Sequence, residues 1–393
     1  MKEGVVISMK KIAAIGMGDR LSDMLKSVLK LSEGQLCLTA ISDIKSKDEL
    51  KKGHQAIADE IEGARLYPDY KELLDNEELD GIMVGTRCSL HSRIAKAVIE
   101  KGIPMFLEKP VSTTMEDWRL LRDGYEKHDS KTVVSFPLRV SPVVTHIKSI
   151  IDSGQLGRIE HVQAFNYVPY GGVYYHNWYR DINETGGLFL QKATHDFDYI
   201  NRLLGFTPTQ IYAAESTQIF TGNKPAGLKC KDCGEYKTCQ DSPYVLENYC
   251  SDVAYGDMCC FCSGSNHDSA TVIVKYDTGM HMSYTQNFFA RKSAAKRGAI
   301  LSGYKGSVEF DWFKDAFYVY PHHSPRTEKH SYDKTAVEHF GGDELLTRNF
   351  IGVVMGTEES VSPLKAGLMS ALMCLKAKES AEKNMAMDID FDM

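Results

Sequence analysis

The sequence predicts an α/β protein, in which a doubly wound parallel sheet is followed by an α+β domain built on an open, mostly antiparallel sheet. Short apolar strands alternate with amphipathic helices up to about residue 138, and longer strands of alternating polarity follow. A chain of 393 residues is also long enough for about two domains. We therefore expect one domain in residues 1–138 and a second in residues 139–393.

The first half contains five short apolar segments that are expected to form the parallel sheet. Helical patterns, with apolar residues three or four positions apart, lie between them as in βαβ units. The capping-box spacing of Thr113 and Glu116 marks the start of one of these helices. The expected strands are residues 10–16, 36–43, 79–86, 103–110 and 132–137.

The second half has the pattern of antiparallel hairpins packed with helices. Strands that alternate apolar and polar residues meet at turns over residues 277–279 and 304–306, each of which ends in glycine. Helices are expected over residues 141–154 and 363–383. The expected strand regions are residues 159–168, 270–289, 297–312 and 316–321, the second and third of which contain the turns.

Composition restricts the classes of function. A net charge of −7 gives no support for nucleic-acid binding, which favours a basic surface. No apolar run reaches the roughly 18 to 20 residues that cross a bilayer, and the N-terminal segment lacks a signal-peptide core. We expect a cytoplasmic protein that acts on a small molecule, with neither nucleic acid nor membrane as a partner.

A glycine pair after the first expected strand indicates a dinucleotide site. Gly16 and Gly18 precede a helix, so that backbone N–H groups and the helix N-terminus can meet a pyrophosphate. Leu21 replaces the third glycine of the usual G-x-G-x-x-G pattern. Asp43 ends the second strand, where a carboxylate accepts hydrogen bonds from ribose hydroxyls and repels a 2′-phosphate. NAD is therefore favoured over NADP.

Residues 186–200, GGLFLQKATHDFDYI, combine a buried helical face with chemistry-bearing side chains. Apolar residues recur every three or four positions, while Gln191, Lys192, His195 and Asp198 crowd the adjoining face. A lysine and a histidine one turn apart on a half-buried helix raise the question of a functional role.

The stretch PMFLEKPVST carries the most specific signal. Glu108, Lys109 and Pro110 form an E-K-P signature at the end of a strand, and residues 80–102 fit the pattern that precedes this signature. On these motifs the chain resembles the Gfo/Idh/MocA oxidoreductases, the glucose–fructose oxidoreductase and inositol dehydrogenase family, over nearly its whole length.

The resemblance implies a Rossmann domain that binds NAD(P), a C-terminal α+β domain, and sugars or cyclitols as typical substrates. Lys109 and His195 match the family's catalytic positions, but Gln191 stands where its aspartate is usual and cannot shuttle a proton. Lys192 is expected to supply electrostatic stabilisation instead, as a third catalytic residue. The expected cofactor-binding residues are Gly16, Gly18, Asp19, Arg20, Asp43, Thr86, His91, Glu108 and Lys109.

An aromatic, glycine-rich segment between residues 165 and 187 is expected to be too polar for a core and to line the substrate pocket. Aromatic faces with hydroxyl tips suit sugar rings, although the same set also suits packing at a subunit interface. The expected substrate-binding residues are Tyr167, Tyr175, His176, Trp178, Arg180, Gln191 and Asp198.

Seven of the ten cysteines lie between residues 230 and 262. Such a cluster, in an insertion at about residues 221–268, indicates a metal site more than a disulfide framework. A structural zinc ion is expected on Cys230, Cys233, Cys239 and Cys250, with an iron–sulfur cluster, free thiols or disulfides as alternatives.

The leading function is an NAD-dependent dehydrogenase that acts on a secondary alcohol of a sugar, glycoside or cyclitol. One alternative is an NAD-dependent glycosidase that oxidises the ring transiently and eliminates the aglycone. Another is a non-catalytic regulator that senses the dinucleotide. The resemblance also implies a homodimer or homotetramer.

Overall fold

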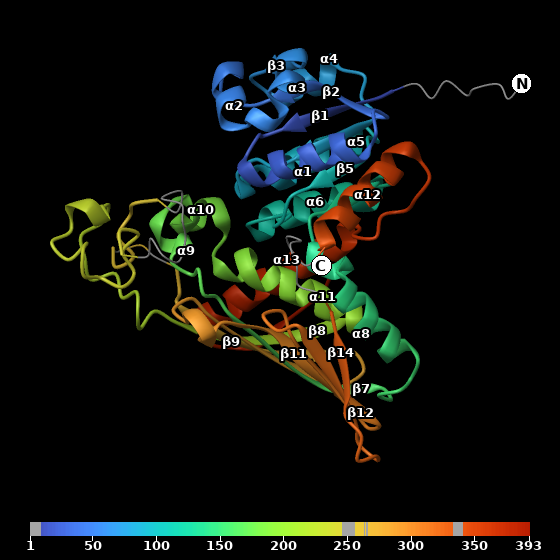
Figure 1. Cartoon of the computed structure of the whole chain (residues 1–393), viewed down its shortest axis with the longest axis vertical. Helices are drawn as coiled ribbons and strands as arrows, with labels where there is room; N and C mark the ends of the chain where they lie inside the picture. The colour runs from blue at the N-terminus through green and yellow to red at the C-terminus, as the bar shows by residue number, and fades with distance from the viewer. Residues whose placement is uncertain (1–8, 246–255, 263, 265, 333–340) are drawn as a thin grey trace, which may run out of the picture. The chain divides into compact units, whose positions relative to one another are not determined.

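The computed structural model packs into two units, each described by itself below (Figure 1). One unit contains Met1–Pro142 and Val337–Ala371, and the other contains Val143–Ala336 and Leu372–Met393. Packing therefore places a late segment of the chain with the N-terminal residues, which the pattern along the sequence did not indicate. The structure describes residues 9–245, 256–262, 264, 266–332 and 341–393.

The first unit is built on a parallel sheet whose described strands follow the order β3-β2-β1-β4-β5-β6. The five strands expected from the sequence are confirmed, and β3 adds a short edge strand. The chain reverses direction across the sheet between β1 and β4, and open α/β sheets bind ligands at such a switch point. The strands are β1 (Lys10–Ile15), β2 (Leu36–Ser42), β3 (Arg65–Tyr67), β4 (Gly81–Val84), β5 (Met105–Leu107) and β6 (Thr132–Val134).

Helices connect these strands and complete the first unit. The helix predicted from the capping box begins one residue later than expected, because Thr114 rather than Thr113 accepts a hydrogen bond from the Asp117 backbone N–H (3.1 Å). The helices are α1 (Asp19–Leu31), α2 (Lys47–Gly53), α3 (Ala58–Gly63), α4 (Tyr70–Asn76), α5 (His91–Glu100), α6 (Met115–Lys127) and α7 (Pro137–Val140).

Helix α12 (Gly342–Met355) also belongs to the first unit, although the sequence pattern did not single it out. Its buried Leu346 and Phe350 share one hydrophobic core with Leu21 and Leu25 of α1. Burial of this apolar surface holds a segment more than 300 residues away in sequence against the N-terminal helix.

The second unit is built on an open sheet whose described strands follow the order β14-β13-β12-β11-β7-β10-β9-β8-β15. Only β7 and β10 pair in parallel among these strands, and both predicted hairpins, β9–β10 and β11–β12, are confirmed. The strands are β7 (Ile159–Tyr167), β8 (Pro208–Ser216), β9 (Ser269–Tyr276), β10 (His281–Asn287), β11 (Lys296–Gly303), β12 (Gly306–Asp311), β13 (Ala316–Pro321), β14 (Glu328–Ser331) and β15 (Met387–Asp388).

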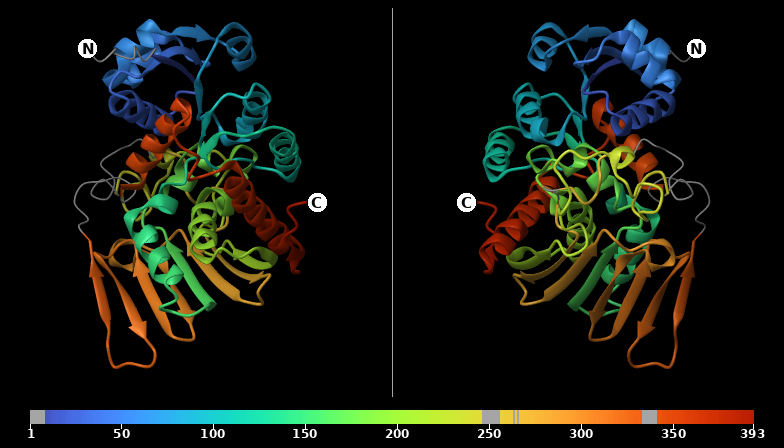
Figure 2. Two further views of the ribbon diagram at one scale, coloured as in Figure 1. Left: turned by 90° about the vertical axis from the view of Figure 1, so that its right-hand side faces the viewer. Right: turned by 90° about the vertical axis from the view of Figure 1, so that its left-hand side faces the viewer.

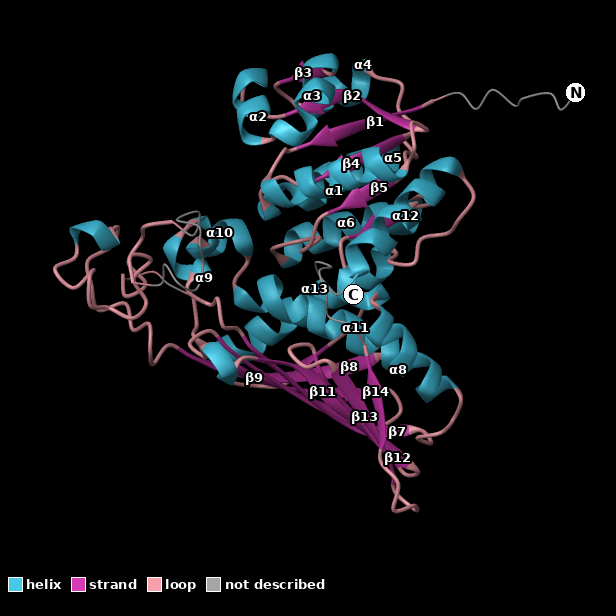
Figure 3. Ribbon diagram, in the orientation of Figure 1, coloured by secondary structure: helices cyan, strands magenta, loops and turns pink. Residues whose placement is uncertain are grey.

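Helices α8 (Pro142–Asp152), α11 (Thr194–Leu204) and α13 (Leu364–Lys383) lie along one face of this sheet, which fans out as an open layer (Figures 1 and 2). Two short helices, α9 (Val173–His176) and α10 (Ile182–Thr185), follow β7. The described residues between β8 and β9 are mostly loops and turns (Figure 3). None of the helices in the described part of the chain is long and apolar enough to cross a membrane.

Candidate active site

The turn after β1 has the geometry that a bound pyrophosphate requires. Gly16 has a positive φ of 79°, and a Cβ atom there would lie 2.6 Å from Cγ2 of Thr86 in the loop after β4. Gly18 precedes α1, and in the described residues no side chain caps the first N–H groups of that helix. These N–H groups, together with the positive end of the helix dipole, fit a phosphate.

Leu21 occupies the place of the usual third glycine, and the structure explains how the close packing survives. A Cβ atom on Gly85 would lie 2.6 Å from Cβ of Leu21. The Leu21 side chain therefore fits because the residue that faces it, directly after β4, is a glycine without a Cβ atom. The sequence contains this glycine, but only the pairing of β1 with β4 gives it meaning.

Asp43 lies at the carboxyl end of β2, as expected, and joins the glycine turn to that strand. One carboxylate oxygen accepts a hydrogen bond from the Met17 backbone N–H (2.7 Å), and the other accepts from the Lys45 backbone N–H (2.8 Å). Each oxygen keeps a second lone pair, which suits the two hydroxyls of a ribose.

The E-K-P segment follows β5 at the same carboxyl edge of the sheet, because Leu107 pairs with Val84 and Val84 pairs with Ile15. Glu108 is buried and Lys109 is partly buried, and the bond between Lys109 and Pro110 is a cis peptide. Sequence reasoning thus predicted which strand ends meet at this edge.

His91 and the charged residues at the start of α1 take structural positions at this edge. His91 is buried, with Nδ1 2.8 Å from the carbonyl oxygen of Pro110 and Nε2 3.1 Å from that of Thr86. It ties together the loops after β4 and β5, and burial lowers its pKa. The Arg20 guanidinium pairs with Asp343 of α12, and its Nε lies 3.6 Å from Glu108. Asp19 is exposed in the first turn of α1.

The expected helix of residues 186–200 starts irregularly in the second unit. Residues Phe189–Ala193 form a π-helix turn, and the α-helix α11 begins only at Thr194. Such turns occur often at functional sites, because the extra residue redirects side chains. Gln191 is buried and donates to the carbonyl oxygen of Thr185 (3.0 Å). His195 is half-buried in the first turn of α11, and Asp198 is buried.

Lys192 is buried beside two tyrosines. Its Nζ donates a hydrogen bond to the phenolic oxygen of Tyr170 (2.5 Å) and lies 5.3 Å from the ring centroid of Tyr174. Burial lowers the pKa of Lys192, Tyr170 opposes this shift, and the charge of Arg297 adds to it.

Asp196 is a residue that sequence reasoning missed. It is fully buried, and its carboxylate accepts hydrogen bonds from Asn166 (2.8 Å), Tyr284 (2.9 Å) and Arg297 (2.8 Å). These partners come from β7, β10 and β11, so one carboxylate fixes the start of α11 to the centre of the sheet. The sequence signal for it was an aspartate directly after His195, on a helix with an apolar face.

The aromatic segment after β7 is partly core, which corrects the expectation that it is too polar to be buried. Tyr174 and Tyr175 belong to a buried cluster with Phe220 and Phe288, and the Tyr175 hydroxyl donates to the carbonyl oxygen of His267 (2.7 Å). A tyrosine can be buried when its hydroxyl has a hydrogen-bond partner, as that of Tyr175 has. Other expected substrate residues remain partly exposed: Tyr167 at the end of β7, and Trp178, which stacks on Tyr179.

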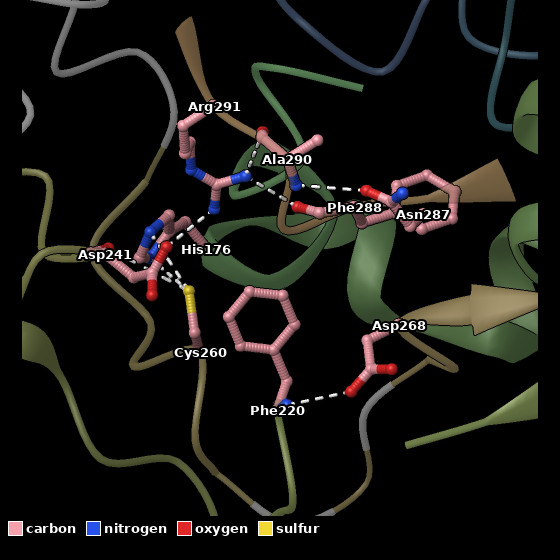
Figure 4. Close-up of polar contacts among 9 residues, drawn as sticks. All are labelled: His176, Phe220, Asp241, Cys260, Asp268, Asn287, Phe288, Ala290 and Arg291. Atoms are coloured by element: carbon pink, nitrogen blue, oxygen red, sulfur yellow. Dashed lines mark hydrogen bonds and ion pairs between the residues drawn. The ribbon is translucent and has the colours of Figure 1, made fainter. Parts of the chain in front are cut away.

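His176 and Arg180, expected to bind substrate, instead make hydrogen bonds to residues of the insertion. His176 Nδ1 donates to the carbonyl oxygen of Met258 (2.6 Å), and Nε2 lies 3.2 Å from the Sγ of Cys260 (Figure 4). Burial raises the pKa of the Cys260 thiol and lowers that of His176, so the pair is neutral and unlike a thiolate nucleophile. Arg180 donates to the carbonyl oxygens of Tyr175, Cys259 and Cys262.

An ion pair also fixes the insertion to the second unit's sheet region. Asp241 of the insertion pairs with Arg291 after β10 (2.6 Å), and Arg291 also donates to the carbonyl oxygens of Phe288 and Ala290 (Figure 4). Asp268 accepts from the Phe220 backbone N–H (3.0 Å), which joins the two ends of the insertion. The middle of the insertion is thereby attached to the segment after β10, and its two ends are attached to each other.

The described cysteines do not support the expected zinc site. No three His, Cys, Asp or Glu side chains in the described residues are arranged to hold a metal ion, and Cys250 lies outside them. Cys230 instead packs with Cys259 and Cys262 in a small buried cluster. Cys259 and Cys262 have the spacing of a second C-x-x-C, which the expected ligand set left out although it indicates that these two thiols lie close together. Cys230, Cys233, Cys239, Cys259, Cys260 and Cys262 form no disulfide with one another.

Two family models match the chain. Residues 10–136 match the oxidoreductase family with an NAD-binding Rossmann fold, and residues 144–309 match the GFO/IDH/MocA C-terminal domain. Together they define an oxidoreductase with an NAD-binding Rossmann domain. The chain belongs to the Gfo/Idh/MocA oxidoreductase family.

Individual relatives are distant. The oxidoreductase-like protein YteT of Bacillus subtilis (strain 168) is 25% identical over 273 residues, which are 63% of this chain and 63% of YteT. The scyllo-inositol 2-dehydrogenase (NAD(+)) of the same organism is 25% identical over 172 residues, 42% of this chain and 46% of that protein. The chain thus spans about half to just under two thirds of these relatives' lengths.

Levoglucosan dehydrogenase, solved in complex with NADH and levoglucosan, has a similar fold. Its TM-score is 0.74, and the match covers 97% of this chain and 99% of that one at 18% identity. At this identity the likeness concerns the fold alone.

Proposed function

We propose that this protein is an NAD-dependent oxidoreductase that transfers a hydride between the nicotinamide and a secondary alcohol of a sugar, glycoside or cyclitol. The observation that carries the proposal is the carboxyl edge of the first unit's sheet. There the glycine turn, Asp43 and the segment Glu108–Lys109 follow strands β1, β2 and β5. Inositol dehydrogenases among the relatives support the substrate class.

The cofactor would be held by the chain's own backbone and one carboxylate. The uncapped N-terminus of α1 and the turn at Gly16 and Gly18 suit the pyrophosphate. Asp43 suits the ribose and disfavours a 2′-phosphate, which supports NAD over NADP. Bound at this edge, the cofactor supplies the hydride acceptor.

Proton transfer is assigned to Lys109 and His195. Oxidation of an alcohol requires a base for the hydroxyl proton, and amine and imidazole groups both serve. The Gln191 amide donates to the carbonyl oxygen of Thr185 and has no acidic or basic group, so Gln191 is assigned to substrate binding and not to proton transfer. Lys192 is assigned the stabilisation of negative charge on the reacting oxygen.

The test is to mix the purified protein with NAD and a panel of inositols, free sugars, anhydrosugars and glycosides, and to follow NADH absorbance. A substrate-dependent rise supports the proposal and identifies the substrate class. Lys109→Met and His195→Gln should each lower kcat by about 100-fold or more. The surface variant Lys26→Met is the control and should leave the rate unchanged.

The replacement of the usual aspartate by Gln191 favours one second candidate, a glycosidase that oxidises the ring only transiently. In that case no NADH accumulates, NAD remains bound, and glycosides are cleaved only in its presence. Product analysis on the glycoside arm of the same panel distinguishes the two candidates. A protein that binds NAD but turns over nothing in either assay contradicts both of them and supports a sensing role.

A further inference from the structure

A network of hydrogen bonds runs through the second unit from a partly exposed side chain to the fully buried Asp196. Glu215 of β8, whose side chain is 32% exposed, lies 2.7 Å from Nδ1 of His267, and Nε2 of His267 lies 2.9 Å from Nε2 of Gln286. The Tyr284 hydroxyl lies 3.1 Å from Oε1 of Gln286 and 2.9 Å from Oδ2 of Asp196. The network therefore ends in the first turn of α11.

The amide of Gln286 sets the direction of these hydrogen bonds. Its nitrogen only donates, so Nε2 of His267 accepts, and the imidazole hydrogen lies on Nδ1 and is donated to Glu215. An amide has no acidic or basic group with which to pass a proton along. The network therefore transmits orientation, and not protons, towards Asp196.

A single hydrogen is shared at the inner end of the network. The Tyr284 hydroxyl has one hydrogen and two acceptors, Oε1 of Gln286 and the carboxylate of Asp196. While the amide donates to His267, its oxygen faces Tyr284 and competes with Asp196 for that hydrogen. An amide released from His267 can turn over, donate to the tyrosine oxygen and leave the hydrogen to Asp196 alone. The contact at His267 thus changes the hydrogen bonding of the Asp196 carboxylate.

The network lies where an apolar side chain would serve the fold equally well. Gln286 is fully buried, at an inward position of β10 like Met282 and Tyr284. Replacing hydrogen-bonded buried groups by apolar groups of the same shape is often neutral for stability. Buried polar networks instead specify one arrangement. The arrangement specified here is that of the first turn of α11, which contains His195.

We propose that His267 is a positioning residue for His195, the proton-transfer residue of the proposed function. It acts through Gln286 and Tyr284 on the Asp196 carboxylate, and so on the first turn of α11, and takes no part in the chemistry itself. This inference rests on the proposed function and deepens it, because it names the residues that hold the imidazole of His195 in place.

The kinetic experiment uses the full-length protein with NAD and its best substrate. Tyr284→Phe keeps the ring that packs against Phe197 but removes the hydroxyl, and should lower kcat by about 10- to 100-fold with little change in KM. The matched control is Tyr276→Phe on β9, whose buried hydroxyl donates to Asn201 near the other end of α11 (3.0 Å). This control should lower the Tm to a similar extent but keep the wild-type kcat.

A double-mutant cycle and a rescue test whether the residues act as one network. His267→Leu should lower kcat, but adding it to Tyr284→Phe should cost no more than about twofold further, because the path from His267 is already broken. Glu215→Gln keeps an oxygen for the imidazole N–H and should retain most of the activity, whereas Glu215→Leu should resemble His267→Leu. Independent structural effects would instead multiply in the double variant.

A measurement without turnover completes the test. In NMR spectra of protein labelled with 15N-histidine, the signals lost in His267→Leu should show a hydrogen on Nδ1 and none on Nε2. Tyr284→Phe should shift the ring signals of His195, assigned by their loss in His195→Gln, and Tyr276→Phe should not. A hydrogen on Nε2 of His267, unmoved His195 signals, or kcat losses that multiply in the double variant overturn this inference. A wild-type protein with no redox activity on any substrate instead contradicts the proposed function, and the NMR comparison still decides the coupling to His195.

Discussion

Gly16 lies so close to Thr86 that a Cβ atom on the glycine would be 2.6 Å from Cγ2 and 2.7 Å from Cα of the threonine. The turn after β1 therefore presses against the loop after β4, at the point where the sheet changes direction. A side chain on Gly16 would push the two loops apart and displace the N–H groups that suit a pyrophosphate.

We predict that Gly16→Ala weakens NAD binding by about tenfold or more, which is about 1.4 kcal/mol. Isothermal titration with NAD is the measurement. Gly34→Ala is the matched control, because Gly34 has a similar φ of 82° but meets no atom within 4 Å. Both variants bear the cost of the left-handed backbone, so equal NAD affinities would contradict a role for the contact with Thr86.

Asp43→Asn should weaken NAD binding and improve the relative affinity for NADP. The amide has one acceptor oxygen in place of two and no charge, so it cannot serve both Met17 N–H and Lys45 N–H as the carboxylate does. The ratio of NAD to NADP affinity is the quantity to measure. Asp69→Asn, at the N-terminus of α4, removes a charge that also accepts a backbone N–H (2.7 Å) and should leave that ratio unchanged.

Local patterns predicted the strands and hairpins because each pattern repeats over a few residues. The carboxyl edge of the first sheet was predictable for the same reason, since Gly16, Asp43 and Lys109 all follow apolar strands. Partners distant in sequence were not predictable. The contact of Gly85 with Leu21 and the pairing of Arg20 with Asp343 depend on which segments meet, and no short-range period encodes that.

The second unit illustrates the limit more sharply. The polar residues Lys192 and His195 on a helix with an apolar face were visible in the sequence. The π-helix turn that changes the helical spacing between them was not, because no short sequence pattern encodes it. The burial of Tyr174 and Tyr175 was not predicted, because whether a tyrosine is buried depends on whether its hydroxyl has a hydrogen-bond partner. That depends on tertiary contacts.

The buried ion pair of Asp196 and Arg297 yields a prediction about stability. Arg297→Met leaves the buried carboxylate of Asp196, on α11, without its main counter-charge, which should cost about 3 to 5 kcal/mol and lower the Tm. Thermal unfolding followed by circular dichroism measures this. Arg158→Met removes an arginine of similar length from the exposed pair with Glu160 and should barely change the Tm. Similar losses in both variants would contradict a special role for the buried pair.

The last prediction concerns acid stability. Burial lowers the pKa of His176, so the folded protein keeps this imidazole neutral where the unfolded chain already binds a proton. The unfolded state then holds more protons as the pH falls through about 6.5, and the free energy of unfolding decreases. His176→Gln should lower the Tm at neutral pH, because it loses the contacts to Met258 and Cys260, but should lose less Tm between about pH 7.5 and about pH 5.5 than the wild type.

The control for this measurement is His323→Gln, which removes an exposed imidazole and should keep the full acid loss of the wild type. An undiminished acid loss in His176→Gln would assign the effect to another buried imidazole. His91 is then the residue to change, because burial lowers its pKa as well and its ring contacts the carbonyl oxygens of Thr86 and Pro110. A loss that tracks His91 alone would place the acid-sensitive step in the first unit, at the loops that border the proposed cofactor site.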